Sequence, residues 1–325
     1  MDTNLPADLG LDLVRATEAA AIIAGRWMGL GQPEQADYAA AQAMATSLNA
    51  LAIDGRIVIG EEGKLGQHSS LDSGMHVGTG AGPALDIVLD PVDGSRLLAM
   101  GHSDAISVIG AAPRGAMRSL YPAVYMDKIV VDRETAASLV PECLDAPAAW
   151  TLGMVARIKG KAVRDLIVFV LNRPRHAHLI DEIRTAGARV ALRTEGDIAG
   201  ALSAAAHSEV DLLMGIGGAA EGVVASCGVK SLGGGMLARL APQSEAERQA
   251  ILAAGLDPKA VYTCEDLVAG EAIFFAATGI TSGSLLAGVR YKGGEAETES
   301  LVLRRETGTR RVIRAYHSLK LAPDG

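Results

Sequence analysis

Apolar residues recur at helical spacing near the start of the chain. Within residues 8–29, Leu11, Val14 and Ile22 fall on one face of a helix with a period of about 3.6 residues. Residues 34–52 form a second stretch that is rich in alanine, the strongest helix former. The pattern therefore predicts two consecutive helices before the first strand.

Short apolar runs bounded by glycine, proline or polar residues predict strands. In the first part of the chain these runs are residues 56–60, 87–89 and 104–111. Further along, strands are predicted at 166–171, 188–192 and 210–214, and helices at 176–187 and 197–207. Alternating strands and helices are typical of a parallel sheet covered by helices, so this part is expected to form a parallel-sheet unit. A helix is predicted at 243–255, and the last strands are predicted at 272–277, 299–305 and 311–316.

The change of pattern places a domain boundary near residue 135. Residues 133–161 contain Pro141 and Pro147 and are interpreted as a connector with a short helix. We therefore expect an N-terminal α+β unit of residues 1–135 and a C-terminal α/β unit of residues 136–325. The fold class is α/β.

The composition is that of a folded, acidic protein. Hydrophobic residues make up 49% of the 325 residues, and the net charge is −8, which argues against a nucleic-acid partner. Cys143, Cys227 and Cys264 are widely spaced and are expected to be reduced, packed thiols. The start lacks the pattern of a secretory signal, and no run of about eighteen apolar residues occurs, so we expect a cytoplasmic protein that does not bind membranes.

Carboxylates and a hydroxyl follow the strand predicted at 87–89. Pro91 is expected to end this strand, and Gly94 permits a tight turn. Oxygen ligands on a rigid strand end suit Mg²⁺ or Mn²⁺, and a second ion would complete a clamp for displacement at a phosphate. The alternative is that this Asp-Pro-x-Asp-Gly sequence only closes the strand, because its residues favour turns. The side chains expected to converge are Asp90, Asp93 and Ser95.

Glu61 and Glu62 follow the strand predicted at 56–60. A carboxylate at this position would add a ligand to the same metal site. The combination of this Gly-Glu-Glu sequence with the Asp-Pro-Val-Asp-Gly-Ser turn favours the metal site over a simple turn.

Arg173 and Arg175 follow directly after the strand predicted at 166–171. Open α/β sheets bind ligands at the carboxyl ends of their strands, and guanidinium groups bind phosphate with paired hydrogen bonds, so these arginines are candidate phosphate ligands. Surface ion pairs are the alternative. Glu195 and Asp197 end the next strand and are candidates to accept hydrogen bonds from sugar hydroxyls, although Asp197 is equally suited to cap the following helix.

Residues 215–222 read Gly-Ile-Gly-Gly-Ala-Ala-Glu-Gly, between a predicted strand and a predicted helix. Their glycines are expected to let backbone N–H groups approach an anion at the helix N-terminus. A dinucleotide site is a weaker alternative, because the spacing is not Gly-x-Gly-x-x-Gly. Glu221 is either a metal ligand or an acid that the helix dipole favours.

These motifs resemble the lithium-sensitive phosphatase superfamily, which includes inositol monophosphatases and fructose-1,6-bisphosphatases. The chain is most similar to class II fructose-1,6-bisphosphatases. The segments that carry the resemblance span nearly the whole chain: Gln35–Asp37, Ile59–Glu61, Val77–Gly80, Asp90–Ser95, Val124–Lys128, Arg173–His176, Gly215–Gly222 and Ala277–Thr281.

The resemblance implies a layered α/β/α/β/α sugar-phosphatase fold of the fructose-1,6-bisphosphatase and inositol monophosphatase type. It implies hydrolysis of the 1-phosphate of fructose 1,6-bisphosphate, and of the similar sedoheptulose 1,7-bisphosphate, in gluconeogenesis or the Calvin cycle. It also implies a homo-oligomer with roughly two or three Mg²⁺ or Mn²⁺ ions per site. The metal ligands implied are Asp37, Glu61, Asp90, Asp93 and Glu221. The residues implied to contact the sugar bisphosphate are Asp93, Gly94, Ser95, Tyr125, Arg173, Pro174, Arg175, Glu195, Gly196, Asp197 and Gly218.

The chain departs from the family pattern in the loop from Glu62 to Ser70, where an acid expected to help activate water is missing. The broader superfamily uses a second glutamate and a turn hydroxyl for this step, so Glu62 and Ser95 are the candidates to orient and deprotonate the attacking water. Two alternatives remain. One is a phosphatase of the same fold with another sugar phosphate as substrate, and the other is a catalytically impaired sugar-phosphate-binding protein.

Overall fold

The computed structural model describes residues 5–61, 69–206 and 208–319. The chain divides into two compact units, one of residues 1–114 with 272–325 and one of residues 115–271. This division differs from the boundary near residue 135 that the sequence suggested. The C-terminal strands return to the first unit, because β11 (Phe274–Gly279) pairs antiparallel with β4 (Ile106–Pro113) along its whole length.

Among the described residues of the first unit, eight strands form one mixed sheet. Its order is β12-β13-β11-β4-β3-β1-β2, and β14 pairs with β13. β1 and β3 are parallel, and the other neighbouring pairs are antiparallel. The remaining strands of this sheet are β1 (Asp54–Ile59), β2 (His76–Val77), β3 (Ala84–Asp93), β12 (Arg290–Lys292), β13 (Glu295–Arg304) and β14 (Thr309–Ser318).

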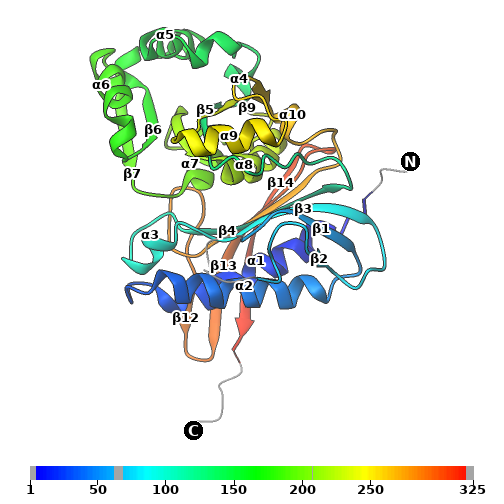
Figure 1. Cartoon of the computed structure of the whole chain (residues 1–325). Coiled ribbons are helices and arrows are strands. Elements are labelled where there is room, and N and C mark those ends of the chain that lie inside the picture. The colour runs from blue at the N-terminus through cyan, green and yellow to red at the C-terminus, as the bar shows by residue number, and fades with distance from the viewer. Residues whose placement is uncertain (1–4, 62–68, 207, 320–325) are drawn as a thin grey trace. The chain divides into compact units, whose positions relative to one another are not determined.

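Two helices, α1 (Leu9–Ala24) and α2 (Pro33–Asn49), lie side by side against this sheet (Figure 1). The first was predicted from its apolar spacing and the second from its alanine content, and the positions of both are confirmed. Leu13 and Met44 are completely buried and share a core with strand residues such as Ile87. Full burial of a side chain of this kind stabilises the fold by about 1.5–3 kcal/mol. The short helices of the unit are η1 (Gly25–Trp27) and α3 (Ser95–Ala99).

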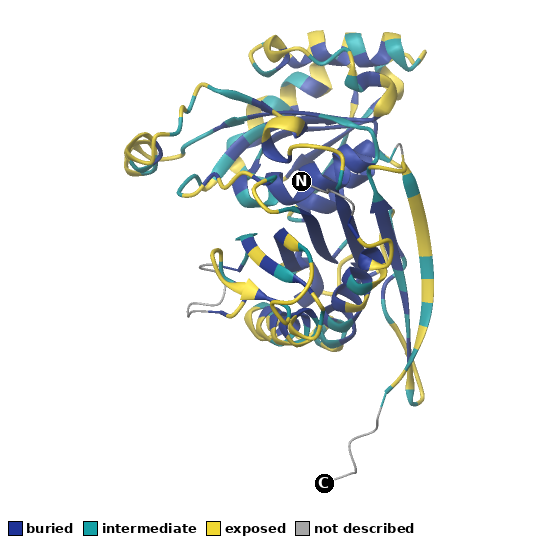
Figure 2. Ribbon diagram, turned by 90° about the vertical axis from the view of Figure 1, so that its right-hand side faces the viewer, coloured by how far each residue is buried: buried dark blue, intermediate teal, exposed yellow. Residues whose placement is uncertain are grey.

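β14 lies at an edge of the sheet of the first unit. It pairs with β13 in unbroken antiparallel register from Thr309, opposite Arg304, to Ser318, opposite Glu295. Figure 2 shows most of this strand in the colours of exposed and intermediate residues, just before the C-terminal trace. Its polar side chains therefore stand at the surface of the unit.

The sheet of the second unit is mixed, with the order β10-β9-β5-β8-β6-β7 in its described part. The expected parallel arrangement is correct for β6, β7 and β8. The sheet also holds three strands that were not predicted, and they make it mixed: β5 pairs antiparallel with β8 and β9, and β10 pairs antiparallel with β9. The strands are β5 (Tyr125–Val131), β6 (Ile167–Leu171), β7 (Arg189–Arg193), β8 (Leu212–Gly218), β9 (Gly235–Leu240) and β10 (Val261–Thr263).

Helices cover both faces of this second sheet. Val168 and Val170 of β6 belong to a core with α5 and α6, whereas Phe169 between them contacts the position of Gly200 in α7. Successive side chains of a strand point to opposite faces, so α5 and α6 cover one face of the sheet and α7 covers the other. The helices are α4 (Arg133–Ala136), η2 (Pro141–Leu144), α5 (Ala148–Ile158), η3 (Val163–Asp165), η4 (Pro174–His176), α6 (Ala177–Thr185), α7 (Asp197–Ala205), α8 (Ala219–Ser231), α9 (Glu245–Ala253) and α10 (Cys264–Leu267).

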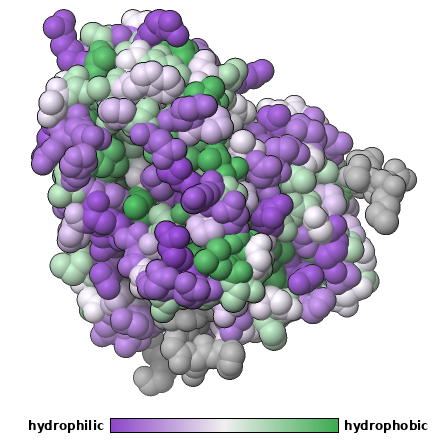
Figure 3. Space-filling model, turned by 45° about the horizontal axis from the view of Figure 1, so that its top comes forward, coloured by the Kyte–Doolittle hydropathy of each residue, from purple (hydrophilic) through white to green (hydrophobic). Residues whose placement is uncertain are grey.

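The two mixed sheets and their helices confirm the α/β class. No helix in the described ranges combines the length and the apolar composition that crossing a membrane requires. The face shown in Figure 3 carries many hydrophilic side chains, with smaller hydrophobic groups between them.

Candidate functional site

The turn between β3 and α3 carries the predicted metal-binding sequence. β3 runs on to Asp93, so the prediction that Pro91 ends the strand is wrong. The pairing with β4 shifts register between Asp90 and Asp93, and this irregularity accommodates a proline that has no N–H to donate to the ladder. Gly94 follows with a φ of 93°, a left-handed conformation that favours glycine, and confirms the predicted tight turn.

Ser95 links this turn to helix α2. Its Oγ donates a hydrogen bond to Oδ1 of Asp37 at 2.5 Å and also lies 3.2 Å from the carbonyl oxygen of Val92. The N–H of Val92 in turn donates to Oδ1 of Asp90 at 3.1 Å. The structure thus brings three of the predicted site residues, Asp37, Asp90 and Ser95, into one polar cluster.

Glu61 and Asp90 lie at the same end of two neighbouring strands, the carboxyl end of β1 and β3. β1 and β3 are parallel, with Ile59 opposite Val88, and each carboxylate comes two residues after its member of this pair. The Glu61 N–H donates to the carbonyl oxygen of Leu71 at 3.1 Å, which fixes the backbone there. Glu62 lies outside the described residues, so its predicted catalytic role stays a prediction.

The four candidate metal ligands of the first unit are all buried carboxylates: Asp37, Glu61, Asp90 and Asp93. Carboxylates are seldom buried unless cations or hydrogen bonds compensate for their charge, and oxygen donors of this type are the ones that Mg²⁺ and Mn²⁺ prefer. The chemistry of the donor set therefore fits a divalent ion. As they stand in the described part of the chain, however, no three His, Cys, Asp or Glu side chains are grouped closely enough to hold one.

In the second unit, Arg175 is held by two neighbours. Its Nε and Nη2 donate to the carbonyl oxygen of Ile216 at 3.3 and 2.9 Å, and its guanidinium lies 4.9 Å from the centre of the Tyr125 ring. Arg173 is held less tightly, with Nη2 at 3.8 Å from Oε1 of Glu195. The structure thus brings together Tyr125 with Arg175, and Arg173 with Glu195, at the strand ends where the sequence predicted a ligand.

Pro174 begins the short helix η4, and His176 ends it. The His176 Nε2 accepts a hydrogen bond from the Ile216 N–H at 2.8 Å, so the proton of the neutral ring is on Nδ1, which donates to the Leu171 carbonyl oxygen at 2.6 Å. Burial is the main cause that lowers the pKa of His176. This neutral histidine joins β6 to β8 and fixes the carbonyl group that Arg175 binds.

Lys128 is a site residue that sequence reasoning missed. Its side chain is fully buried, and its Nζ donates to Oδ2 of Asp197 and, at 3.2 Å, to the carbonyl oxygen of Gly218. Asp197 is the first residue of α7, and Gly196 is the N-cap with a φ of 87°, so the alternative that Asp197 caps the helix is wrong. The available signal was a lysine within the apolar run from Met126 to Val131.

The glycines of residues 215–222 make room for these polar side chains. Gly215 and Gly217 lie within β8, paired with Lys128 and Met126, so the prediction that they open the helix is wrong for both. A Cβ on Gly217 would lie 2.0 Å from Oδ2 of Asp197. The small size of Gly217 therefore admits the lysine–aspartate pair, whereas a Cβ on Gly215 would lie 3.0 Å from Nε2 of His176.

Gly218 is the N-cap of α8, and Glu221 lies in the first turn of that helix as predicted. A Cβ on Gly218 would lie 1.6 Å from Oε2 of Glu221, so the carboxylate folds back over the start of the helix. Lys128 binds the Gly218 carbonyl oxygen and thereby fixes the backbone from which Glu221 projects.

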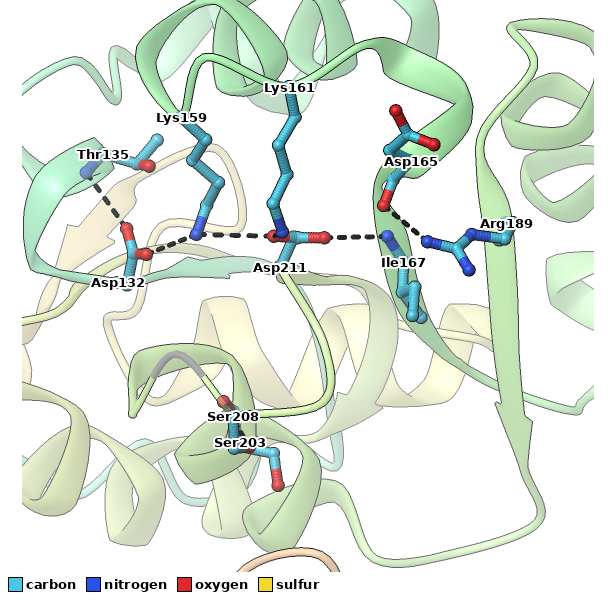
Figure 4. A network of polar contacts seen from close by, with 10 residues as sticks. All are labelled: Asp132, Thr135, Lys159, Lys161, Asp165, Ile167, Arg189, Ser203, Ser208 and Asp211. Atoms are coloured by element: carbon cyan, nitrogen blue, oxygen red, sulfur yellow. Dashed lines mark hydrogen bonds and ion pairs between the residues drawn. The ribbon is translucent and has the colours of Figure 1, made fainter.

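A second ionic network lies at the other ends of β5 and β8, away from Tyr125 and Gly218 (Figure 4). Lys159 bonds Asp132, which follows β5, and also lies 3.6 Å from Oδ1 of Asp211, which precedes β8. Lys161 donates to the same Asp211 oxygen at 2.6 Å, and the other oxygen accepts from the Ile167 N–H at 2.9 Å. With two lysines and two aspartates, this network is internally balanced and joins three strands and the end of α5.

Buried oxygen donors with a turn hydroxyl in one unit, and guanidinium groups beside carboxylates in the other, make up the chemistry of an α/β phosphatase. The comparisons agree. Residues 7–317 match the family described as "Bacterial fructose-1,6-bisphosphatase, glpX-encoded". The chain is 40% identical to the "Fructose-1,6-bisphosphatase class 2" of Haemophilus influenzae over 96% of each chain. It is 37% identical to the "Fructose-1,6-bisphosphatase 1 class 2" of Escherichia coli K12, again over 96% of each chain. The chain belongs to this family of class 2 fructose-1,6-bisphosphatases.

Proposed function

We propose that this chain is a phosphoric monoester hydrolase that converts fructose 1,6-bisphosphate to the monophosphate and inorganic phosphate by removing the 1-phosphate. Family membership over nearly the whole chain supports the substrate. The observation that carries the proposal is the hydrogen bond from Ser95 Oγ to Asp37, which places a turn hydroxyl among buried carboxylates. The same reaction in gluconeogenesis is the expected cellular role.

The proposed metal ligands are Asp37, Glu61, Asp90, Asp93 and Glu221. When bound, Mg²⁺ or Mn²⁺ neutralises phosphate charge, polarises the P–O bond and favours ionisation of water. The burial of the first four side chains supports this assignment. A buried carboxylate has lost water that would stabilise its charge, so pairing with a cation becomes more favourable. Two or three such ions, a homo-oligomer and a cytoplasmic location remain predictions.

The proposed role of Ser95 is to orient the attacking water. Its single hydroxyl proton is donated to Asp37, so its remaining lone pairs are available to accept a hydrogen bond from water. A carboxylate is then needed to take the proton as the water attacks phosphorus in line, and Glu62 is the proposed base.

The proposed partner of the distal phosphate is Arg173 rather than Arg175. Two nitrogens of the Arg175 guanidinium group, Nε and Nη2, already donate to the Ile216 carbonyl oxygen, and the face of the group covers Tyr125, so Arg175 acts mainly to hold the pocket. Within the described part of the chain, the Arg173 side chain has one ionic neighbour, Glu195, at 3.8 Å, a distance beyond a hydrogen bond. Arg173→Ala should raise KM for the bisphosphate more than it lowers kcat, because it removes a contact made equally in the ground and transition states. An equal fall in kcat would place Arg173 at the reacting phosphate.

The function is tested by phosphate release from a panel of sugar phosphates. The panel holds fructose 1,6-bisphosphate, sedoheptulose 1,7-bisphosphate and several monophosphates, each with Mg²⁺, with Mn²⁺ and with a chelator. Asp90→Asn should lower metal-dependent release by more than about a hundredfold, while Asp181→Asn on the exposed face of α6 should not change it. Preference for a different sugar phosphate would revise the substrate. Binding of the bisphosphate without any turnover would replace the enzyme by the impaired binding protein.

A further inference from the structure

The turn end of the β13–β14 hairpin is rich in arginine, although the chain as a whole is acidic. Residues 304–314, which we name the arginine hairpin, contain five arginines and a single acid, Glu306, although the whole chain has a net charge of −8. Such a local reversal of charge attracts anions. The arginines are Arg304, Arg305, Arg310, Arg311 and Arg314.

A cavity of about 330 Å³ lies between the arginine hairpin and the start of α1. Phe274 and Val302 line it on the apolar side, and Arg304, Arg311, Thr307 and Thr309 line it on the polar side. This volume lies in the range of small-molecule sites, which combine apolar walls with a few polar groups. All of these residues belong to the first unit.

The strand register explains why these side chains meet. Arg304 of β13 is opposite Phe274 of β11 on one side and Thr309 of β14 on the other. Val302, two residues earlier, is opposite Arg311. Directly opposed residues, and residues two apart on a strand, share one face of a sheet. The strand register therefore places Phe274 and Val302 on the same face of the sheet as the guanidinium groups of Arg304 and Arg311.

Arg304 is fixed in place, and Arg311 is not. The Nε and Nη2 of Arg304 donate to Oε2 of Glu306 at 3.1 and 2.6 Å, and its guanidinium lies 5.1 Å from the centre of the Phe274 ring. The side chain of Arg311 is exposed and makes no hydrogen bond or ion pair with any residue in the described ranges. Glu306 balances one of the two arginines, so the cavity keeps a positive charge on Arg311.

The two threonines add a hydrogen-bond donor. Thr307 Oγ1 and Thr309 Oγ1 lie 2.6 Å apart, so one hydroxyl donates to the other. Each hydroxyl has one proton, and the accepting threonine therefore keeps its proton for another acceptor. A negatively charged oxygen near Arg311 would satisfy both.

We propose that this cavity is a second ligand site, separate from the substrate site, for a small organic anion with an apolar body. The apolar body packs on Phe274 and Val302, the anionic head pairs with Arg311, and a threonine hydroxyl donates to the head. A cation of the same shape is rejected by the two guanidinium groups.

Binding of 2-naphthalenesulfonate to the full chain, measured by calorimetry, tests this site. The probe has an apolar body and an anionic head that a phosphatase does not hydrolyse. We expect saturable binding of one probe per chain, and weaker binding by at least about tenfold in both Arg311→Glu and Arg311→Gln. Arg310→Glu is the matched control, because Arg310 is exposed on the same hairpin and does not line the cavity. It should change the affinity by less than about twofold.

Four results would overturn the proposal. They are the absence of saturable binding, equal loss in the Arg310 and Arg311 variants, equal affinity for the neutral 2-naphthylmethanol, and displacement of the probe by saturating fructose 1,6-bisphosphate. The second would indicate general attraction by the hairpin, and the last would assign the probe to the substrate site. Because Arg311 is exposed, unfolding is not expected to accompany its replacement, and the melting temperature of each variant checks this.

Discussion

Replacing the buried Lys128 by methionine should destabilise the second unit strongly. The lysine is completely buried between Asp197 and the carbonyl oxygen of Gly218, which lies 3.2 Å from its Nζ. Its loss leaves the carboxylate of Asp197, whose side chain is only 10% exposed, without the ammonium group that compensates for its burial. Removing one partner of a buried ion pair costs about 3–5 kcal/mol. At about 2–4 °C per kcal/mol, the melting temperature of this unit should fall by roughly 6–20 °C.

Urea unfolding, followed by the fluorescence of Trp150 in α5 in a Trp27→Phe background, gives this free energy. The double variant Lys128→Met with Asp197→Leu removes both charges and should be more stable than the sum of the single effects predicts, by about 1–3 kcal/mol. Lys161→Met is the control, since Lys161 is 38% exposed and should contribute less than about 1 kcal/mol. A loss below about 1 kcal/mol in Lys128→Met, or strict additivity in the double variant, would show that Lys128 does not compensate for the buried charge of Asp197.

Three further predictions follow from single contacts. Ser95→Ala should lower kcat by about a hundredfold or more with little change in melting temperature. Ser95→Thr keeps the hydroxyl and should keep most of the activity. Equal activity of both variants would exclude the hydroxyl from the reaction. Burial alone would raise the pKa of Asp211. Hydrogen bonds from Lys161 and the Ile167 N–H outweigh burial and lower this pKa below the ordinary 3.8. Its stabilising contribution is therefore present above about pH 4 and is lost as pH falls through the lowered pKa, so the stability difference between wild type and Asp211→Asn should shrink below pH 4; a constant difference would contradict this. Gly153→Ala in α5 adds a methyl group that meets no neighbouring atom, and it should stabilise the fold by about 0.4–1 kcal/mol. Gly217→Ala should destabilise the fold, because its methyl group would collide with Asp197. The opposite order of melting temperatures would argue against the close contact at Gly217.

Segments with a clear local pattern were predicted well. The strand predicted at 166–171 corresponds to β6, and the helix predicted at 176–187 corresponds to α6. β5 was not predicted, because Asp127 and Lys128 interrupt its apolar run with charges whose compensation comes from distant residues. The return of β11 to the first sheet was not predicted either, because its partner β4 lies more than a hundred residues earlier and no local pattern records such a pairing.

The candidate site follows the same division. The types of residue in the metal turn, the left-handed Gly94 and the place of Glu221 in a first helical turn all follow from local sequence. The Ser95–Asp37 contact joins segments 58 positions apart and needs the fold to be known. The close contacts at Gly215 and Gly217 needed it as well, because the side chains beside these glycines come from other segments of the chain.

The most direct test of the proposed function is the identity of the product. The purified chain is incubated with fructose 1,6-bisphosphate and Mg²⁺ or Mn²⁺, and the phosphorus resonances are followed by nuclear magnetic resonance. We expect fructose 6-phosphate and inorganic phosphate to appear together, and neither to form with a chelator present or in Asp90→Asn. Formation of fructose 1-phosphate, or of any product without a divalent ion, would contradict the account.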